Sequence, residues 1–170
     1  MNLFEAIEKR HSVRKYKPIP IEAEKLNKIY DAINKAPSAG NLQAYQVYTV
    51  TNSEMKQKLS KAALGQESLI QAPLVLIFCA VPARSKKYGK RGETLYCIQD
   101  ATIAAAYAQL AATALGLATC WVGAFDESEV IKALKLPIGH RPVAILPIGY
   151  ANESPEPTTR MALKDLIKGI

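Results

Sequence analysis

The sequence has few of the residues that mark metal sites, disulfides or membrane spans. Two of its 170 residues are histidines and three are cysteines, and Cys79, Cys97 and Cys120 stand singly in apolar surroundings. Without a Cys-x-x-Cys pair, this composition argues against a metal site and predicts reduced, mostly buried thiols. No apolar run approaches the roughly 20 residues that span a bilayer. Residues 1–8 carry acids and no hydrophobic signal core, so we expect a cytoplasmic protein.

The overall composition is that of an ordinary folded protein. Apolar residues make up 49% of the chain and charged residues 22%, which excludes general disorder. The chain has neither an internal repeat nor a low-complexity linker. Its length suits a single domain over residues 1–170 with a substantial core.

The net charge of +7 is concentrated in residues 82–93, which hold five basic residues and one acid. We expect this stretch to form a small basic loop. Such a patch can attract nucleic acid, or it can steer a small anionic substrate or a nicotinamide cofactor. The stretch has one tyrosine and no repeated aromatic residues, so it lacks the stacking platforms of single-strand binders. Nucleic acid is therefore the weaker interpretation.

Hydrophobic periodicity predicts an α+β fold of about four strands and five or more helices. The run 74–81 is apolar throughout, which predicts a strand buried on both faces. The other strands are expected at residues 47–51, 118–122 and 143–150. The helices are expected at residues 3–10, 26–36, 53–64, 94–117 and 126–136, with a helical turn at 161–167.

The predicted helix 94–117 is rich in alanine and apolar nearly all round. A helix that is apolar on every side must be buried on every side. A second subunit makes this easier in a chain of this length, so we predict an obligate homodimer; the alternative is the central helix of a monomer. Asp100 is the exception in this helix, because a buried carboxylate needs a partner. We expect it to pair with an arginine such as Arg141, in a structural role.

Three arginines stand in short motifs at opposite ends of the chain. Arg10 and Arg14 follow the first helix, and Arg160 ends the motif Pro155-x-Pro157-x-x-Arg160. The planar guanidinium fork is the side chain best matched to a phosphate. We therefore predict that the fold brings these three arginines together around one phosphate. The alternative is a solvated basic surface.

Taken in order, the motifs resemble those of the nitroreductase family of FMN-dependent oxidoreductases, over essentially the whole chain. The resemblance implies an α+β fold with a mixed central sheet flanked by helices. It also implies an intertwined homodimer with two FMN sites at the interface and a C-terminal arm that reaches over the partner. The motifs are residues 10–14, Pro37-Ser38-Ala39-Gly40-Asn41-x-Gln43, the alanine-rich helix leading to Trp121-Val122-Gly123, Pro147-x-Gly149-Tyr150 and the stretch 155–160.

The resemblance also implies a cofactor site, residue by residue. The FMN phosphate and ribityl chain would be held by Arg10, Ser12 and Arg14, with His11 beside them and Arg160 clamping the same phosphate. Arg14 is the candidate cation near N1 and O2 of the ring, where it would stabilise reduced flavin. Residues expected from the partner subunit are Pro37, Ser38, Ala39, Asn41 and Gln43, and those expected along the flavin edge near N5 are Val122, Gly123 and Ala124.

One stretch departs from the family pattern. Where well-known members carry an asparagine and a lysine, residues 65–73 of this chain contain no lysine, and Gln66 is the flavin contact expected there. The implied activity is transfer of hydride from NADH or NADPH through flavin N5 to an electron-poor small molecule, in a ping-pong mechanism. No catalytic side chain is required. The alternatives are a flavin-binding protein without catalysis and a basic module that binds nucleic acid.

Overall fold

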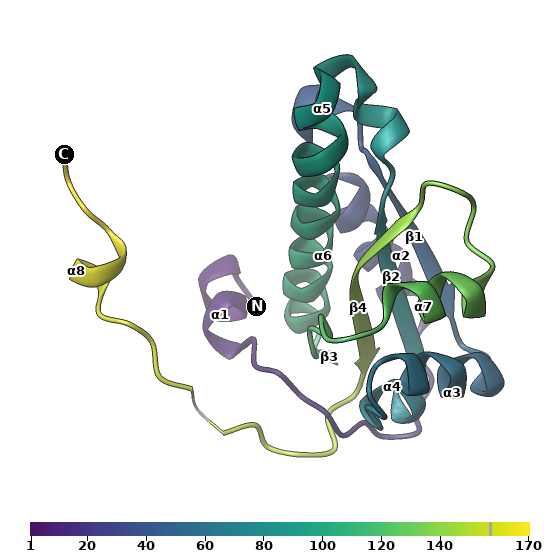
Figure 1. Ribbon diagram of the computed structural model, residues 1–170. Helices are drawn as coiled ribbons and strands as arrows, with labels where there is room; N and C mark the ends of the chain where they lie inside the picture. The colour runs from purple at the N-terminus through teal and green to yellow at the C-terminus, as the bar shows by residue number, and fades with distance from the viewer. Residues whose placement is uncertain (157) are drawn as a thin grey trace.

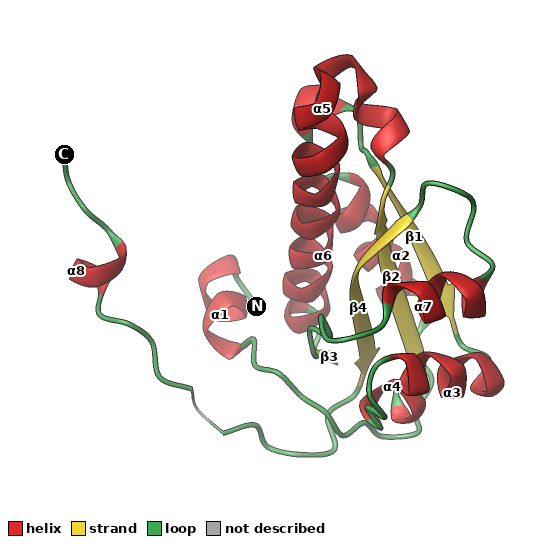
Figure 2. Cartoon of the chain, in the orientation of Figure 1, coloured by secondary structure: helices red, strands yellow, loops and turns green. Residues whose placement is uncertain are grey.

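A four-stranded sheet forms the centre of the protein in a computed structural model that describes residues 1–156 and 158–170 (Figures 1 and 2). Pro157 of the C-terminal motif lies outside the described residues. The strand order is β1-β2-β4-β3, and all three strand pairs are antiparallel. A mixed sheet was expected, but among the described residues the isolated bridge between Ser12 and Thr119 is the only parallel pairing. The strands are β1 (Tyr45–Val50), β2 (Leu74–Ala80), β3 (Ala118–Thr119) and β4 (Arg141–Gly149).

Helices cover both faces of this sheet. On one face lie α2 and α6, and on the other lie α3, α4 and α7. Short 3-10 turns form at Ala39–Asn41 and Pro82–Tyr88, and a π-helical turn forms at Gly92–Tyr96. The α-helices are α1 (Leu3–Lys9), α2 (Ala23–Asn34), α3 (Ser53–Ala62), α4 (Ser68–Gln71), α5 (Gly89–Arg91), α6 (Cys97–Ala114), α7 (Glu127–Leu134) and α8 (Leu163–Leu166).

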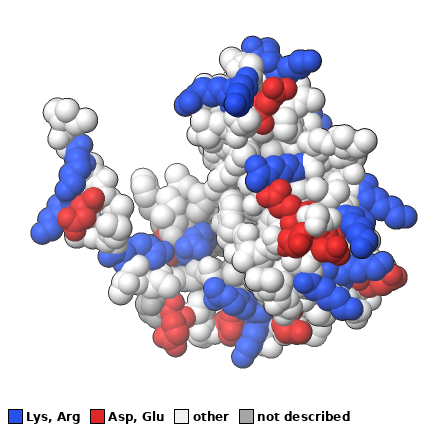
Figure 3. All heavy atoms as spheres, in the orientation of Figure 1, with Lys and Arg blue, Asp and Glu red and all other residues white. Residues whose placement is uncertain are grey.

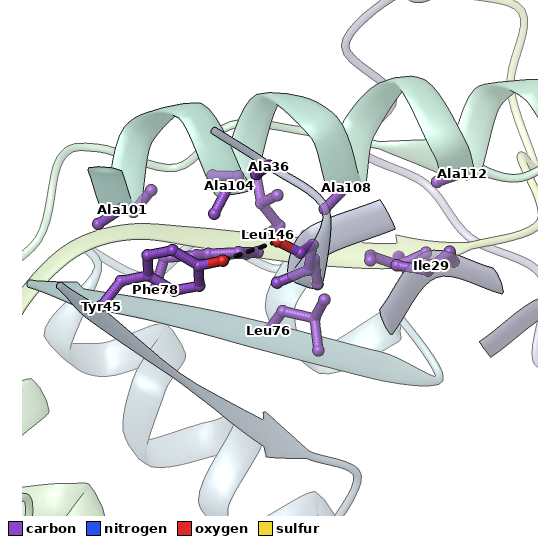
Figure 4. Packing of buried hydrophobic residues seen from close by; sticks show 14 of the residues in the cluster. Ile29, Ala36, Tyr45, Leu76, Phe78, Ala101, Ala104, Ala108, Ala112 and Leu146 are labelled. Carbon is purple, nitrogen blue, oxygen red and sulfur yellow. Dashed lines mark hydrogen bonds between the residues drawn. The ribbon is translucent and has the colours of Figure 1, made fainter. Parts of the chain in front are cut away.

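Strand β2 is buried along its whole length, which confirms the sequence-based expectation. Its side chains alternate between two cores, because successive residues of a strand point to opposite faces. Leu76 and Phe78 join α2 and α6 in one core, whereas Val75 and Ile77 join α3, α4 and α7 in the other. Figure 4 shows the alanines of α6 lying over Phe78 and its neighbours. Alanine at these positions lets the helix backbone approach the sheet closely.

Helix α6 is not buried on every side within one chain. Its sheet-facing residues are inaccessible, but Tyr107 is 40% exposed, and Thr102 and Ala106 beside it are also exposed. Ala106 and Tyr107 follow Thr102 by four and five positions, so the three lie on one side of the helix. An apolar helix with one open face is typical of a surface that another subunit covers.

Two further apolar segments extend away from the core. Helix α1 lies beside α6 and leaves Phe4 80% exposed. The chain after β4 runs as an extended arm, and α8 lies on that arm away from the sheet (Figure 1). The arm exposes large apolar side chains at Met161, Leu163, Leu166, Ile167 and Ile170.

Residues 82–96 are helical, so the expected basic loop is wrong for this stretch. Pro82 begins the 3-10 turn, because its fixed φ suits a first helical position. The π-helical turn then runs directly into α6. Among the described residues, no helix has the length and hydropathy that a membrane crossing requires.

Candidate functional site

The structure brings the three motif arginines to one hollow. Arg10, Arg14 and Arg160 line a cavity of about 520 Å³ between the segment after α1 and the C-terminal arm, which we call the arginine hollow. Within the described residues, none of these guanidinium groups forms an ion pair with a carboxylate. The other residues that line the hollow are His11, Ser12, Glu153, Ser154, Pro155, Glu156 and Thr158.

The segment 10–16 is extended and is held against the edge of the sheet. Ser12 bridges Thr119 in parallel fashion, and the Val13 amide donates to the Thr119 carbonyl at 3.0 Å. Val13 is buried, whereas Ser12 is half-buried and Arg14 exposed. Arg10, Ser12 and Arg14 alternate along this extended backbone and line the hollow together with His11. Their closeness in the sequence is the local reason why these residues line one cavity.

Two buried side chains, Tyr16 and Cys120, lie next to this segment. The Tyr16 hydroxyl donates to the Val13 carbonyl at 2.6 Å, and burial raises the pKa of Tyr16 so that it remains a donor. Burial also raises the pKa of the Cys120 thiol, against the opposing charge of Arg14. The thiol beside the hollow is therefore neutral at ordinary pH and adds no negative charge to it.

The arm side of the hollow contains a carboxylate that sequence reasoning missed. Glu153 Oε1 accepts the backbone amides of Arg14 at 2.5 Å and of Lys15 at 3.3 Å. This carboxylate therefore ties the arm to the segment 10–16 through backbone groups and does not pair with the guanidinium of Arg14. Arg160 Nη1 donates to Thr158 Oγ1 at 2.6 Å and to the Thr159 carbonyl at 3.0 Å. No local pattern in the sequence marks Glu153, because its contact spans almost the whole chain.

The second group of predicted residues lines a different hollow. Pro37, Ser38 and Ala39 border a cavity of about 550 Å³ whose other wall is the start of α6, which we call the loop hollow. Asn41 is exposed beyond it, and Gln43 turns away: its Nε2 donates to the Asn34 carbonyl at 2.9 Å. Within one chain, then, the predicted site consists of two separate halves.

Asp100 fixes the loop that borders this hollow. The carboxylate is 2% exposed, and it accepts the Ala39 amide at 2.9 Å and the Ala44 amide at 3.2 Å. It therefore holds both ends of the loop 39–44. The expected pairing with Arg141 is wrong, because Arg141 lies at the surface and pairs with Glu127 at 2.9 Å. Two backbone amides satisfy the buried carboxylate without a cation.

The backbone of this loop is in an unusual conformation. Gly40, Asn41 and Gln43 have φ values of 55°, 56° and 45°, in the left-handed region. For a residue with a side chain this region is costly, and such residues persist where surrounding contacts determine the conformation. Here the contacts are those of Asp100 and of Ser38, whose Oγ accepts the Gln43 amide at 3.0 Å.

We expect Gly40→Ala to destabilise the protein more than Gly65→Ala does. Both glycines have positive φ, so both substitutions carry a backbone cost of roughly 1 kcal/mol. At Gly65 a Cβ meets nothing within 4 Å, whereas at Gly40 it would lie 2.1 Å from the Tyr88 hydroxyl. Thermal unfolding of both variants measures the difference. The extra cost at Gly40 should shrink in a Tyr88→Phe background, and an equal cost in both backgrounds would contradict the contact.

The remaining predicted residues, Val122 to Ala124 and Gln66, line neither of the two hollows. Val122 is buried, and its amide and carbonyl are both bonded to Ile145, at 2.9 and 3.0 Å. It has no free backbone group to present, so that role is left to Gly123 and Ala124, which are exposed. Gln66 is half-buried at the turn after α3 and lines neither hollow.

The donor set of the arginine hollow fits the phosphate of FMN. Three guanidinium groups and the Ser12 hydroxyl surround one cavity, and a doubly negative phosphate needs several fixed donors of this kind. The loop hollow, with apolar walls from Ile98 and Ile103, suits a flat ring. Among the described residues, no group of three His, Cys, Asp or Glu side chains is placed to hold a metal ion.

Comparison with known proteins gives consistent matches. A family model described as the nitroreductase family matches residues 7–71 and 61–150. An FMN reductase of Bacillus subtilis is 36% identical over 154 residues, which cover 82% of this chain and 61% of that protein. An NADPH-flavin oxidoreductase of Vibrio harveyi is 28% identical over 168 residues, covering 94% of this chain and 70% of the other. The structure of B. megaterium NfrA2 superimposes with a TM-score of 0.90 at 30% identity, over 99% of this chain and 74% of that one.

Proposed function

Because the chain belongs to the nitroreductase family, we propose that it is an FMN-dependent oxidoreductase that uses NADH or NADPH to reduce an electron-poor small molecule. Nitroaromatics and quinones are the acceptor classes that we propose, with reductant and acceptor reacting in alternating half-reactions. The single observation that carries the proposal is the arginine hollow, where three guanidinium groups that form no ion pair with any described residue line one cavity.

Each half of the site has a separate task in this proposal. Arg10, Ser12, Arg14 and Arg160 hold the phosphate and ribityl chain, with His11 beside them. The loop 37–41 packs against the ring and ribityl chain, and Gly123 and Ala124 offer backbone groups along the ring edge. The redox chemistry is that of FMN, whose N5 exchanges hydride with the reductant and the acceptor. The protein's own residues bind and orient the cofactor and leave one ring face accessible.

We also propose that the two halves meet across a homodimer. Within one chain the arginine hollow and the loop hollow are distinct cavities. The open face of α6, the exposed apolar residues of α1 and those of the arm supply apolar surface for a second copy. Dimerisation would bury this surface and place one protomer's loop beside the other's arginines.

The purified protein is expected to be yellow, with the visible absorption of oxidised flavin. Adding NADH or NADPH under anaerobic conditions should bleach that absorption, and adding a quinone should restore it. A flavin-containing protein that neither reductant bleaches would support flavin binding without catalysis. A protein that binds no FMN, even after incubation with an excess of it, would contradict the proposed function. A colourless protein that shifts nucleic acid in a salt-sensitive manner would instead support the basic module.

A further inference from the structure

The most concentrated charge on the protein lies where β2 connects to α6. Residues 82–96, which we call the basic segment, form the helical turns that lead into the N-terminus of α6, and Figure 3 shows basic side chains gathered there, over α5. One acid, Glu93, accompanies the basic residues. The basic residues are Arg84, Lys86, Lys87, Lys90 and Arg91.

One of these cations, Arg84, binds a distant segment of the chain. Arg84 donates to the carbonyls of Gln43 and Tyr45 and to the Gln46 side chain, so it holds the start of β1. The other four are exposed, and none forms an ion pair within the described part of the chain. Unpaired like charges on neighbouring turns repel one another. An anionic ligand would relieve that repulsion.

The segment holds its charges in defined places. Tyr88 and Tyr96 pack edge to face with ring centroids 5.4 Å apart. Arg91 Nε donates to the Tyr96 hydroxyl at 3.1 Å, and Lys87 Nζ lies 5.0 Å from the centre of the Tyr88 ring. Because the two tyrosines pack on each other, they do not form a platform on which successive bases could stack. This arrangement favours a small anion over nucleic acid.

The basic segment lies directly against the proposed flavin-contacting loop. A Cβ built on Gly40 would lie 2.1 Å from the Tyr88 hydroxyl and 3.1 Å from Lys87 Nζ. Tyr96 also lines the loop hollow together with Ser38 and Ala39. Lys87 therefore stands beside the loop that borders this cavity, and Tyr96 of the same segment forms part of the cavity wall.

We propose that the basic segment binds the 2′-phosphate of NADPH, through Lys87 and Lys90, and makes NADPH the preferred reductant. This inference rests on the proposed function, since it assigns a reductant to the same site. NADPH and NADH differ only in that phosphate, which is strongly anionic and is recognised by fixed cations. Lys87 lies beside Gly40 of the loop, and Lys90 follows in α5, after the 3-10 turn has ended at Gly89.

The inference is tested by titrating the flavin-loaded protein with NADP⁺ and, separately, NAD⁺ in a calorimeter. The wild-type protein should bind NADP⁺ more tightly, and the preference should fall as salt is added. Lys87→Ala should weaken NADP⁺ about fivefold and Lys87→Ala with Lys90→Ala about tenfold or more, while NAD⁺ affinity changes less than about twofold. The matched control is Lys61→Ala, which removes the same charge at an exposed position of α3 and should leave both affinities unchanged.

Equal affinity of the wild-type protein for NADP⁺ and NAD⁺ would overturn the inference, as would equal weakening of both ligands in the Lys87 variants. A salt-sensitive shift of nucleic acid that these variants abolish, without any NADP⁺ preference, would assign the segment to nucleic acid and overturn it as well. Flavin absorption, recorded before each titration, distinguishes the two failures. A protein that stays colourless after incubation with an excess of FMN contradicts the proposed function, whereas a yellow protein without NADP⁺ preference contradicts only this inference.

Discussion

Replacing Arg10 or Arg160 with alanine is expected to weaken FMN binding about 30- to 150-fold. Each substitution removes a charge-assisted phosphate contact, and such a contact contributes roughly 2–3 kcal/mol. Both side chains line the arginine hollow and neither pairs with a carboxylate in the described part of the chain, so their loss leaves no such partner unpaired. Thermal stability without FMN and the oligomeric state should therefore stay close to wild type. Titrating the flavin-free protein with FMN and following flavin fluorescence measures the affinity.

Arg141→Ala provides the matched control for this prediction. It removes the same charge, but Arg141 pairs with Glu127 at the surface and does not line the hollow. FMN affinity should be unchanged in this variant. Wild-type affinity in both the Arg10 and the Arg160 variants would contradict the phosphate assignment, and an equal loss in Arg141→Ala would reduce it to a general charge effect.

Asp100→Ala is expected to destabilise the protein by about 2–4 kcal/mol and to weaken FMN binding as well. The substitution removes the acceptor of two amides, and each unsatisfied buried donor costs roughly 1–3 kcal/mol. Without those bonds to Ala39 and Ala44, the left-handed conformation of the loop loses its main support. Urea unfolding gives the free energy of unfolding, and FMN titration gives the affinity.

Asp100→Asn tests the same contact if the alanine variant does not fold. The amide oxygen can accept one of the two amides, so the loss of stability and of affinity should be intermediate. Asp31→Ala, at an exposed position of α2, is the control and should change neither quantity by much. Wild-type FMN affinity in a folded Asp100→Ala protein would show that the loop needs no fixed conformation to bind the cofactor.

The layers of the fold were predictable because their signals are local. The apolar run of β2 and the alanine-rich stretch of α6 each indicate burial without knowledge of any partner. Boundaries that depend on distant pairing were less predictable. The strand expected over 118–122 has only Ala118–Thr119 in the ladder, and Val122 returns to β4 through a single bridge.

In the site, too, features set by neighbouring residues could be predicted from the sequence, whereas contacts between distant residues could not. The alternation of Arg10, Ser12 and Arg14 is visible in the sequence and places them on one side of extended backbone. The partner of Asp100 was not predictable, because backbone amides exist at every residue and leave no mark in the sequence. A basic stretch predicted to be a loop forms helical turns, in which Tyr88 packs on Tyr96 and Arg84 binds the start of β1. The Arg84 contact joins segments that lie apart in the sequence.

A crystal structure of the protein with FMN tests the central claim most directly. We expect the phosphate within hydrogen-bonding distance of Arg10, Arg14 and Arg160 of one protomer, and the ring against residues 37–41 of a second copy. A phosphate bound away from these arginines, or a cofactor enclosed by a single chain, would contradict the account.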